Sequence, residues 1–227
     1  MITALHTTTA GIGPAVVLVH GMGDSGSVWA GTVEALGADY ACTTIDLPGH
    51  GRSPAPSEQA AYEREAVLAS IDAVLARTGP AVYVGHSLGG YLGLTHCLTR
   101  PDVIRGLVLV AAGPGFRDAA AMQDWNDRVH LSAPRLDVPR VAITTSLHTD
   151  SMVIDRLADV TVPVGLLVGS NDKAFMGAND YMERKLPDVR RRTVDDGRHR
   201  LMRTHPEVVA GLVRDVAAAA GLTPGRQ

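Results

Sequence analysis

The sequence predicts an α/β protein with a mostly parallel central sheet and helices on both faces of that sheet. Two observations lead to this prediction. Short apolar runs recur along the chain and end in glycine-rich turns, which is typical of strands buried on both faces. Segments with the apolar spacing of helices lie between these runs, and strands that alternate with helices form parallel sheets.

The elements are expected in a regular order. Residues 3–9 can form a short edge strand, and the continuous apolar run Ala15–Val19 is the first buried strand. A helix follows around Val28–Leu36, and a second buried strand spans Tyr40–Ile45. The later elements expected are a helix at 58–77, a strand from 81 into a turn at 85–87, a helix at 88–99, strands at 104–111, 162–169 and 189–194, and helices at 175–185 and 206–219.

Residues 116–158 interrupt this alternation. Strand-like runs are absent there, and apolar residues are scattered among polar ones. We expect a small helical cap insertion over the sheet, formed by residues 116–158, and one α/β core formed by residues 1–115 and 159–227. A chain of 227 residues fits such a single core.

Composition narrows the class of function. The formal net charge is −3, so no basic surface for nucleic acid is indicated. No apolar run approaches the length of a membrane span, and the N-terminus lacks a secretory signal pattern. Cys42 and Cys97 fall within predicted elements without metal-ligand spacing, which is typical of reduced thiols. We expect a cytoplasmic protein with a small-molecule substrate and no metal, nucleic-acid or membrane partner.

The run Gly85-His86-Ser87-Leu88-Gly89 lies between a predicted strand and a predicted helix. A serine in the middle of G-x-S-x-G at such a turn has a strained backbone, and its hydroxyl projects away from the sheet. The flanking glycines avoid collisions with the neighbouring strand and helix. The helix start also favours developing negative charge. A simpler interpretation, in which Ser87 only caps the helix, competes with this one.

A serine hydroxyl is a weak nucleophile that needs an imidazole base, and the imidazole needs a carboxylate partner. Asp172 and His199 each follow a predicted strand, so both can reach the carboxyl edge of the sheet, where ligands bind in such folds. We therefore expect Ser87, Asp172 and His199 to form the catalytic group.

Each partner of the serine has rivals nearby. Asp195 and Asp196 are close to His199 in sequence but lie in a turn, so Asp172 is preferred as the acid. His205 precedes Pro206 and has the position of a helix start, so His199 is preferred as the base.

Four stretches resemble the motifs of the α/β-hydrolase family, and the resemblance covers nearly all of the chain except the cap insertion. They are the oxyanion loop at 20–23 with Trp29 downstream, a second loop at 46–53, the nucleophile elbow at 85–90, and the acid and histidine loops at 169–172 and 197–199. The resemblance implies the triad order Ser87, Asp172, His199 and an oxyanion hole made by the backbone N–H groups of Met22 and Leu88.

Substrate specificity is expected to depend on the cap insertion. Its apolar side chains are candidates to line a substrate pocket for a small to medium molecule. His20 is expected beside the pocket as a brace of the oxyanion loop, and His86 is expected at the pocket floor. The cap residues expected in the lining are Met122, Trp125, Val141 and Leu147.

Six arginines crowd the approach to His199, namely Arg190, Arg191, Arg192, Arg198, Arg200 and Arg203. They could form an anion-binding rim that selects a carboxylate or phosphate. They could instead form a solvated surface balanced by Asp188, Asp195 and Asp196. We favour the surface, because alternate residues of a strand face opposite sides of a sheet.

The leading hypothesis for function is a serine carboxylesterase that cleaves an ester or related acyl bond through an acyl-enzyme, with no cofactor. The alternative is the same triad used for C–C bond hydrolysis or lyase chemistry on a carbonyl substrate; residues 172–173 and 197–202 faintly resemble the plant methylesterase and hydroxynitrile lyase branch. Serine at position 87 disfavours a dehalogenase or epoxide hydrolase. A non-enzymatic ligand receptor is disfavoured because all three triad positions are filled.

Overall fold

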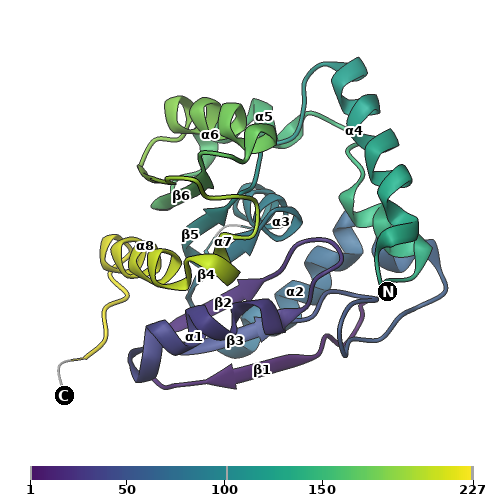
Figure 1. The fold of residues 1–227 in the computed structure, drawn as a ribbon. Coiled ribbons are helices and arrows are strands. Elements are labelled where there is room, and N and C mark those ends of the chain that lie inside the picture. Colours follow the sequence, from purple (N-terminus) through teal and green to yellow (C-terminus); the bar gives the residue numbers. More distant parts are fainter. Residues whose placement is uncertain (1, 101, 226–227) are drawn as a thin grey trace.

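The computed structural model of the protein describes residues 2–100 and 102–225. Its centre is a seven-stranded sheet with the order β1-β3-β2-β4-β5-β6-β7 (Figure 1). Strand β1 (Thr7–Ala10) is antiparallel to β3, and the other neighbouring strands are parallel. The predicted fold class, a mostly parallel sheet in an α/β protein, is therefore confirmed.

The strands lie close to the expected places, except the first. The expected edge strand at 3–9 is formed only by Thr7–Ala10, because β3 ends at Ile45, which is the partner of Thr7, and residues 3–6 have no strand beside them. The other strands are β2 (Ala15–Val19), β3 (Ala41–Ile45), β4 (Ala81–His86), β5 (Ile104–Val110), β6 (Val164–Gly169) and β7 (Val189–Val194).

Helices cover both faces of the sheet. Along β2, Val16 and Leu18 pack toward α1 (Ala30–Leu36) and α8 (Pro206–Ala219), and Val17 and Val19 pack toward the opposite face. That opposite face is covered by α2 (Arg64–Thr78), α3 (Leu88–Thr99) and α6 (Lys173–Lys185). This alternation, which follows from the two-residue period of a strand, gives the protein two apolar layers.

The helix expected at 58–77 is divided in two. A 3₁₀ helix at Gln59–Tyr62 precedes α2, and Glu63 between them has an extended backbone with ψ of 145°. No helix of the described residues is long and apolar enough to cross a membrane.

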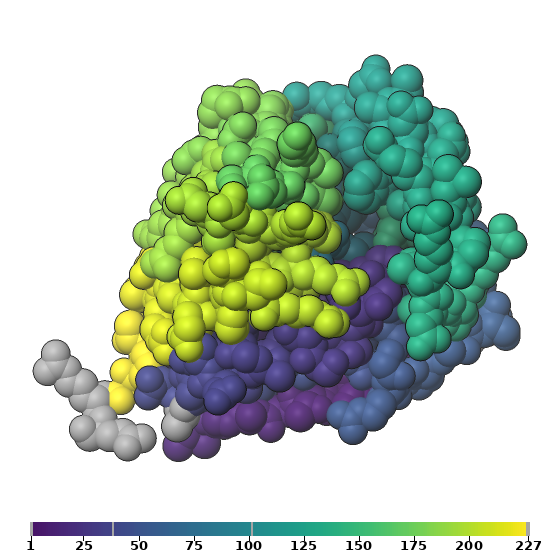
Figure 2. Space-filling model, in the orientation of Figure 1, coloured from purple at the N-terminus to yellow at the C-terminus, as the bar shows by residue number. Residues whose placement is uncertain are grey.

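The region of the cap insertion is helical in the structure. It contains α4 (Ala119–Ser132), α5 (Met152–Asp155) and 3₁₀ helices at Ala133–Arg135 and Arg140–Ser146, and a further 3₁₀ helix, Leu157–Asp159, follows. Figure 1 shows α4 standing apart from the sheet. In Figure 2 the surface is recessed between the teal atoms of this region and the yellow-green atoms near the C-terminus. The boundaries of the insertion stay a prediction.

Candidate active site

Ser87 lies in the turn between β4 and α3, with a strained backbone. Its φ is 49° and its ψ is −112°, a conformation that non-glycine residues rarely adopt. Close packing holds this turn, because a Cβ on Gly85 would lie 2.4 Å from the carbonyl carbon of Gly89. The Ser87 side chain makes no capping hydrogen bond and instead lines a cavity. The interpretation of Ser87 as a simple helix cap is therefore not supported.

Asp172 and His199 are paired in the structure. His199 Nδ1 lies 2.8 Å from Asp172 Oδ2, and the Asp172 side chain is only 7% exposed. A carboxylate accepts hydrogen bonds only, so Nδ1 carries the hydrogen and Nε2 is left free to take a proton. The rival Asp196 instead accepts from Asn171 at 3.4 Å, and Asp195 is exposed.

Two backbone contacts bring the acid and histidine loops together. Gly169 and Gly197 approach so closely that a Cβ on Gly169 would lie 2.2 Å from the Gly197 carbonyl group. The backbone N–H of Asn171 donates to the Gly197 carbonyl at 2.9 Å. Glycine at both positions thus permits the loop contact that sets Asp172 beside His199.

The His199 ring is held between two other rings. It stacks on Phe175 with ring centres 4.8 Å apart, and it lies 4.7 Å from the ring of His86. His86 Nε2 donates to the backbone carbonyl of His199 at 3.0 Å. Because a carbonyl only accepts, this bond fixes the hydrogen of His86 on Nε2. His86 therefore positions the backbone of His199.

Among the described contacts, no hydrogen bond joins Ser87 to His199. The serine is connected to the base through its chain neighbour His86, whose ring packs on His199. Catalytic hydrogen bonds are often long in a free enzyme and shorten when substrate binds. The structure thus brings the three predicted residues to one site but shows only one of the two bonds of a triad.

The oxyanion loop lies directly against the serine. A Cβ on Gly21 would lie 3.2 Å from the Cβ of Ser87. Met22 and Leu88, the residues whose backbone N–H groups are the predicted donors, line the cavity together with Ser87. The start of α3 at Leu88 adds the positive end of a helix dipole at the same place.

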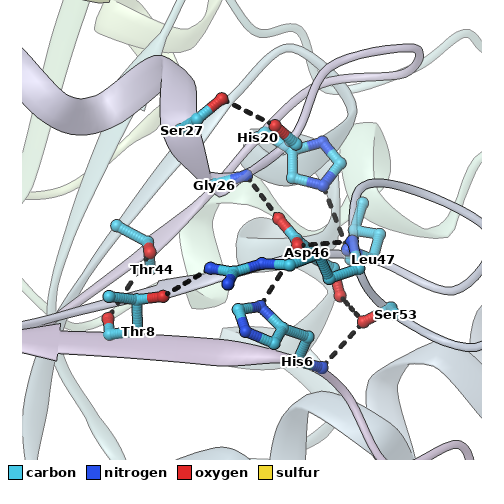
Figure 3. Close-up of polar contacts among 11 residues, drawn as sticks. His6, Thr8, His20, Gly26, Ser27, Thr44, Asp46, Leu47 and Ser53 are labelled. Carbon is cyan, nitrogen blue, oxygen red and sulfur yellow. Dashed lines mark hydrogen bonds and ion pairs between the residues drawn. The ribbon is translucent and has the colours of Figure 1, made fainter.

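His20 ties the oxyanion loop to the second loop (Figure 3). Its Nδ1 donates to the Gly21 carbonyl at 2.7 Å. Its Nε2 accepts from the Leu47 N–H at 3.0 Å, the contact drawn in Figure 3. Burial lowers the pKa of His20 to about 4, with a smaller contribution from His50, so the ring is neutral at pH 7. A neutral ring is required, because Nε2 accepts only in the unprotonated state.

Asp46 connects the second loop to the start of the 3₁₀ helix Gly26–Trp29, which follows the oxyanion loop. It accepts from the backbone N–H of Gly26 at 2.6 Å and from that of Arg52 at 2.8 Å (Figure 3). His6 Nδ1 lies 3.2 Å from its carboxylate. Burial would raise the pKa of Asp46, but the two backbone hydrogen bonds and the nearby histidines together lower it. The second loop thus supports the geometry of the oxyanion loop.

The cavity beside Ser87 has a volume of about 680 Å³, and both the core and the cap insertion contribute to its lining. Of the six side chains expected in the lining, Trp125 is there and the other five are not. His20 and His86 are buried beneath the loops, and Met122 is half-buried on α4. Val141 packs on Ala61 and Tyr62, and Leu147 packs on other cap residues, which explains their absence.

Several lining residues were missed by sequence reasoning. Tyr91 lies one turn after Ser87 on α3, and His148 follows the 3₁₀ helix at Arg140–Ser146. Phe116 and Phe175 are the only phenylalanines of the chain, and each follows a loop at the carboxyl end of a strand. Their positions after these loops could have identified both phenylalanines as candidate lining residues from the sequence.

The arginines near His199 are largely paired with acidic residues. Arg190 contacts Asp188, Arg191 contacts Asp180 and Glu183, and Arg192 contacts Asp215. Arg200 and Arg203 lie 3.5 and 3.0 Å from the Asp24 carboxylate. Among the described residues, none of these six arginines lines the cavity. The arginine in the cavity lining is Arg128. This arrangement supports the solvated surface.

The described residues contain no group of three or more His, Cys, Asp or Glu side chains that could hold a metal ion.

Three buried histidines predict that the fold loses stability in mild acid. Burial lowers the pKa of His20 to about 4 and of His86 to about 3; burial and the Arg64 charge lower that of His148 to about 4. Histidine in the unfolded chain has a pKa of about 6.5. The contribution of the three neutral rings to the free energy of unfolding is therefore fully present above pH 6.5 and is lost as the pH falls toward 3.

Urea unfolding at pH 7.5 and pH 5.0 checks this prediction. Each histidine should lower the free energy of unfolding at pH 5.0 by about 2 kcal/mol. The variant His148→Phe, which has no proton to gain at that position, should show a pH difference smaller by about 2 kcal/mol. Equal stability of the wild type at both pH values would contradict the burial of neutral rings.

Comparisons with known proteins find relatives of this chain. A family model described as "alpha/beta hydrolase fold" matches residues 14–138. A pimeloyl-[acyl-carrier protein] methyl ester esterase from Vibrio parahaemolyticus is 39% identical over 127 residues, which cover 55% of this chain and 46% of that protein. This match therefore spans about half the length of that relative.

A second relative matches over almost its whole length. The pimeloyl-[acyl-carrier protein] methyl ester esterase of Methylococcus capsulatus is 28% identical over 258 residues, covering 95% of this chain and 99% of that protein. Among solved structures, MenH from S. aureus superposes with a TM-score of 0.83 at 16% identity and covers 97% of this chain and 100% of that one. At that identity the superposition shows a shared fold.

Proposed function

The chain belongs to the α/β-hydrolase family, and from that premise we propose that it is a serine hydrolase that cleaves carboxylic esters. The observation that carries the proposal is the Asp172–His199 hydrogen bond of 2.8 Å next to the strained Ser87, which opens onto the cavity. The two related methyl ester esterases support an ester, rather than another acyl bond, as the bond that is cleaved.

In the proposed reaction, Ser87 Oγ attacks the ester carbonyl carbon while His199 Nε2 takes the serine proton. The Asp172 carboxylate stabilises the imidazolium through Nδ1. The tetrahedral oxygen accepts from the backbone N–H groups of Met22 and Leu88, and each such donor contributes about 2.7–4 kcal/mol in comparable sites. His199 then protonates the leaving alcohol, and a water activated by the same nitrogen hydrolyses the acyl-enzyme.

The cavity supports a small to medium substrate. Its volume of about 680 Å³ lies within the usual range for small-molecule pockets. Most of its lining surface is apolar, with aromatic residues such as Trp125 and Phe175, and its one arginine is Arg128. We therefore propose an uncharged or weakly polar acyl group of moderate length as the part that enters the cavity.

Hydrolysis of p-nitrophenyl esters from acetate to decanoate tests the proposal. The wild type should hydrolyse them with an optimum at intermediate chain length, and Ser87→Ala should lower kcat by roughly 10⁴-fold or more. Ser57→Ala, which changes an exposed serine that does not line the cavity, is the control.

One result would contradict the proposed ester hydrolysis. If folded wild type neither hydrolyses these esters nor reacts with a serine-directed phosphonate, ester hydrolysis is excluded. C–C bond cleavage, lyase chemistry and ligand binding would then be the functions to test.

A further inference from the structure

One wall of the cavity contains polar groups that the proposed reaction does not use. Ser146 and His148 both line the cavity, with residue exposures of 9% and 8%. In the described part of the chain, neither Ser146 Oγ nor His148 Nδ1 has a hydrogen-bond partner. Buried polar side chains normally have a partner in the protein, water or a ligand. The unpaired Ser146 hydroxyl, in the same wall as the imidazole of His148, therefore indicates a place for a polar group of the substrate.

This wall is held firmly by α4. Asn126 accepts from the His148 N–H at 2.9 Å, and its amide donates to the His148 carbonyl at 2.8 Å. Trp125 Nε1 donates to the Ser146 carbonyl at 3.1 Å. These three bonds fix the backbone of both residues, so the packing of the cap insertion determines where their side chains lie.

The polar wall lies within reach of the serine. Tyr91 lies one helical turn after Ser87, and its N–H donates to the Ser87 carbonyl at 3.1 Å. The Tyr91 ring meets the His148 ring edge to face at 4.4 Å. The ring centres of Phe116 and Trp125 lie 5.3 and 5.9 Å from the centre of the same imidazole. A substrate group bound at Ser87 can thus extend along Tyr91 to His148.

The His148 imidazole is neutral at pH 7 and can donate one hydrogen bond. Burial and the charge of Arg64 lower its pKa to about 4, so the ring has one hydrogen at pH 7. Its Nδ1 is packed against Gly115, where a Cβ would lie 3.1 Å from that nitrogen. An unpaired buried N–H is rarer than an unpaired acceptor, which places the hydrogen on Nε2.

We propose that Ser146 and His148 form a polar subsite that selects esters with an uncharged oxygen, as a ketone, ether or hydroxyl, in the group that fills the cavity. This inference rests on the proposed ester hydrolysis. An uncharged oxygen fits because the cation next to His148, Arg64, is already paired with Asp150 at 2.9 Å. A carboxylate bound next to His148 would depend on Arg128, the exposed arginine of the same cavity lining, for its counter-charge.

Matched pairs of esters test the subsite. The pairs are p-nitrophenyl pentanoate with its 4-oxo analogue, and p-nitrophenyl heptanoate with its 6-oxo analogue. The measured quantity is the ratio of kcat/KM for the oxo ester to that for the plain ester. For at least one pair this ratio should fall about tenfold in His148→Phe relative to the wild type. Comparing enzymes in this way cancels the intrinsic reactivity of each ester.

Two further variants separate hydrogen bonding from shape. His148→Gln retains an N–H donor and should keep a ratio closer to that of the wild type than His148→Phe does. Ser146→Ala should lower the ratio by a few-fold without changing the aromatic surroundings of His148. The two variants also keep the test valid if His148→Phe does not fold.

The inference fails if the plain esters are hydrolysed but the ratios are the same in wild type and all three variants. It also fails if half-esters with a terminal carboxylate are preferred and Arg128→Gln removes that preference. If the wild type hydrolyses none of the esters, the proposed function itself has failed, which is a distinguishable result.

Discussion

Replacing Asp172 by asparagine is expected to lower kcat for ester hydrolysis by roughly 10⁴-fold while the fold is retained. Asparagine has nearly the same shape, but its amide can donate a hydrogen to His199 Nδ1. That nitrogen would then be an acceptor, and the ring hydrogen would lie on Nε2, which could no longer take the Ser87 proton. The bond of 2.8 Å between Asp172 and His199 is the contact that would be reversed.

Steady-state kinetics on the best p-nitrophenyl ester measures this effect. Asp196→Asn is the matched control, because Asp196 makes a long contact of 3.4 Å to Asn171 and does not contact His199. Its φ of 56° is also one that asparagine tolerates. If Asp172→Asn retained activity and Asp196→Asn lost it, the acid would have been assigned to the wrong loop.

Gly85→Ala is expected to lower the free energy of unfolding by about 3 kcal/mol or more, at or beyond the upper end of overpacking effects. The added Cβ would lie 2.4 Å from three backbone atoms of Gly89 and Gly90, which lie in the first turn of α3. Backbone atoms cannot move aside as a side chain can. The strand and helix would have to separate, and the Ser87 turn with them.

Chemical denaturation followed by circular dichroism measures this loss. Gly177→Ala is the matched control, because no atom lies within 4 Å of the Cβ position and the residue is inside α6. Alanine there should stabilise the protein by about 0.5–1 kcal/mol. A Gly85→Ala protein as stable as the wild type would show that the turn is not packed as described.

The fold and the Ser87 turn could be predicted because their signals are local. Apolar runs such as Ala15–Val19 end in loops, and Gly85 and Gly89 flank the serine at the spacing that a tight strand-to-helix turn requires. The pairing of Asp172 with His199 follows from topology, since β6 and β7 are parallel neighbours whose carboxyl ends meet at one edge.

The cavity lining was harder to predict because it depends on tertiary packing in the cap insertion. Val141 and Leu147 have the hydrophobicity of pocket residues, but they fill contacts within the core and cap. His148 has no distinctive sequence neighbours, and its place in the wall is set by two hydrogen bonds between its backbone and the Asn126 side chain on another element. His20 and His86 were expected beside the pocket, but both are buried and hydrogen-bond to loop backbone instead of lining the cavity.

Covalent labelling with a fluorophosphonate, followed by peptide mass spectrometry, tests the central claim most directly. The reagent is attacked only by an activated nucleophile, so we expect one phosphonyl group per chain, located on Ser87. Labelling should be absent in Ser87→Ala and much slower in Asp172→Asn, in which the base is impaired. A folded wild-type protein that remains unlabelled, or that is labelled at a residue other than Ser87, would contradict the proposed hydrolase mechanism.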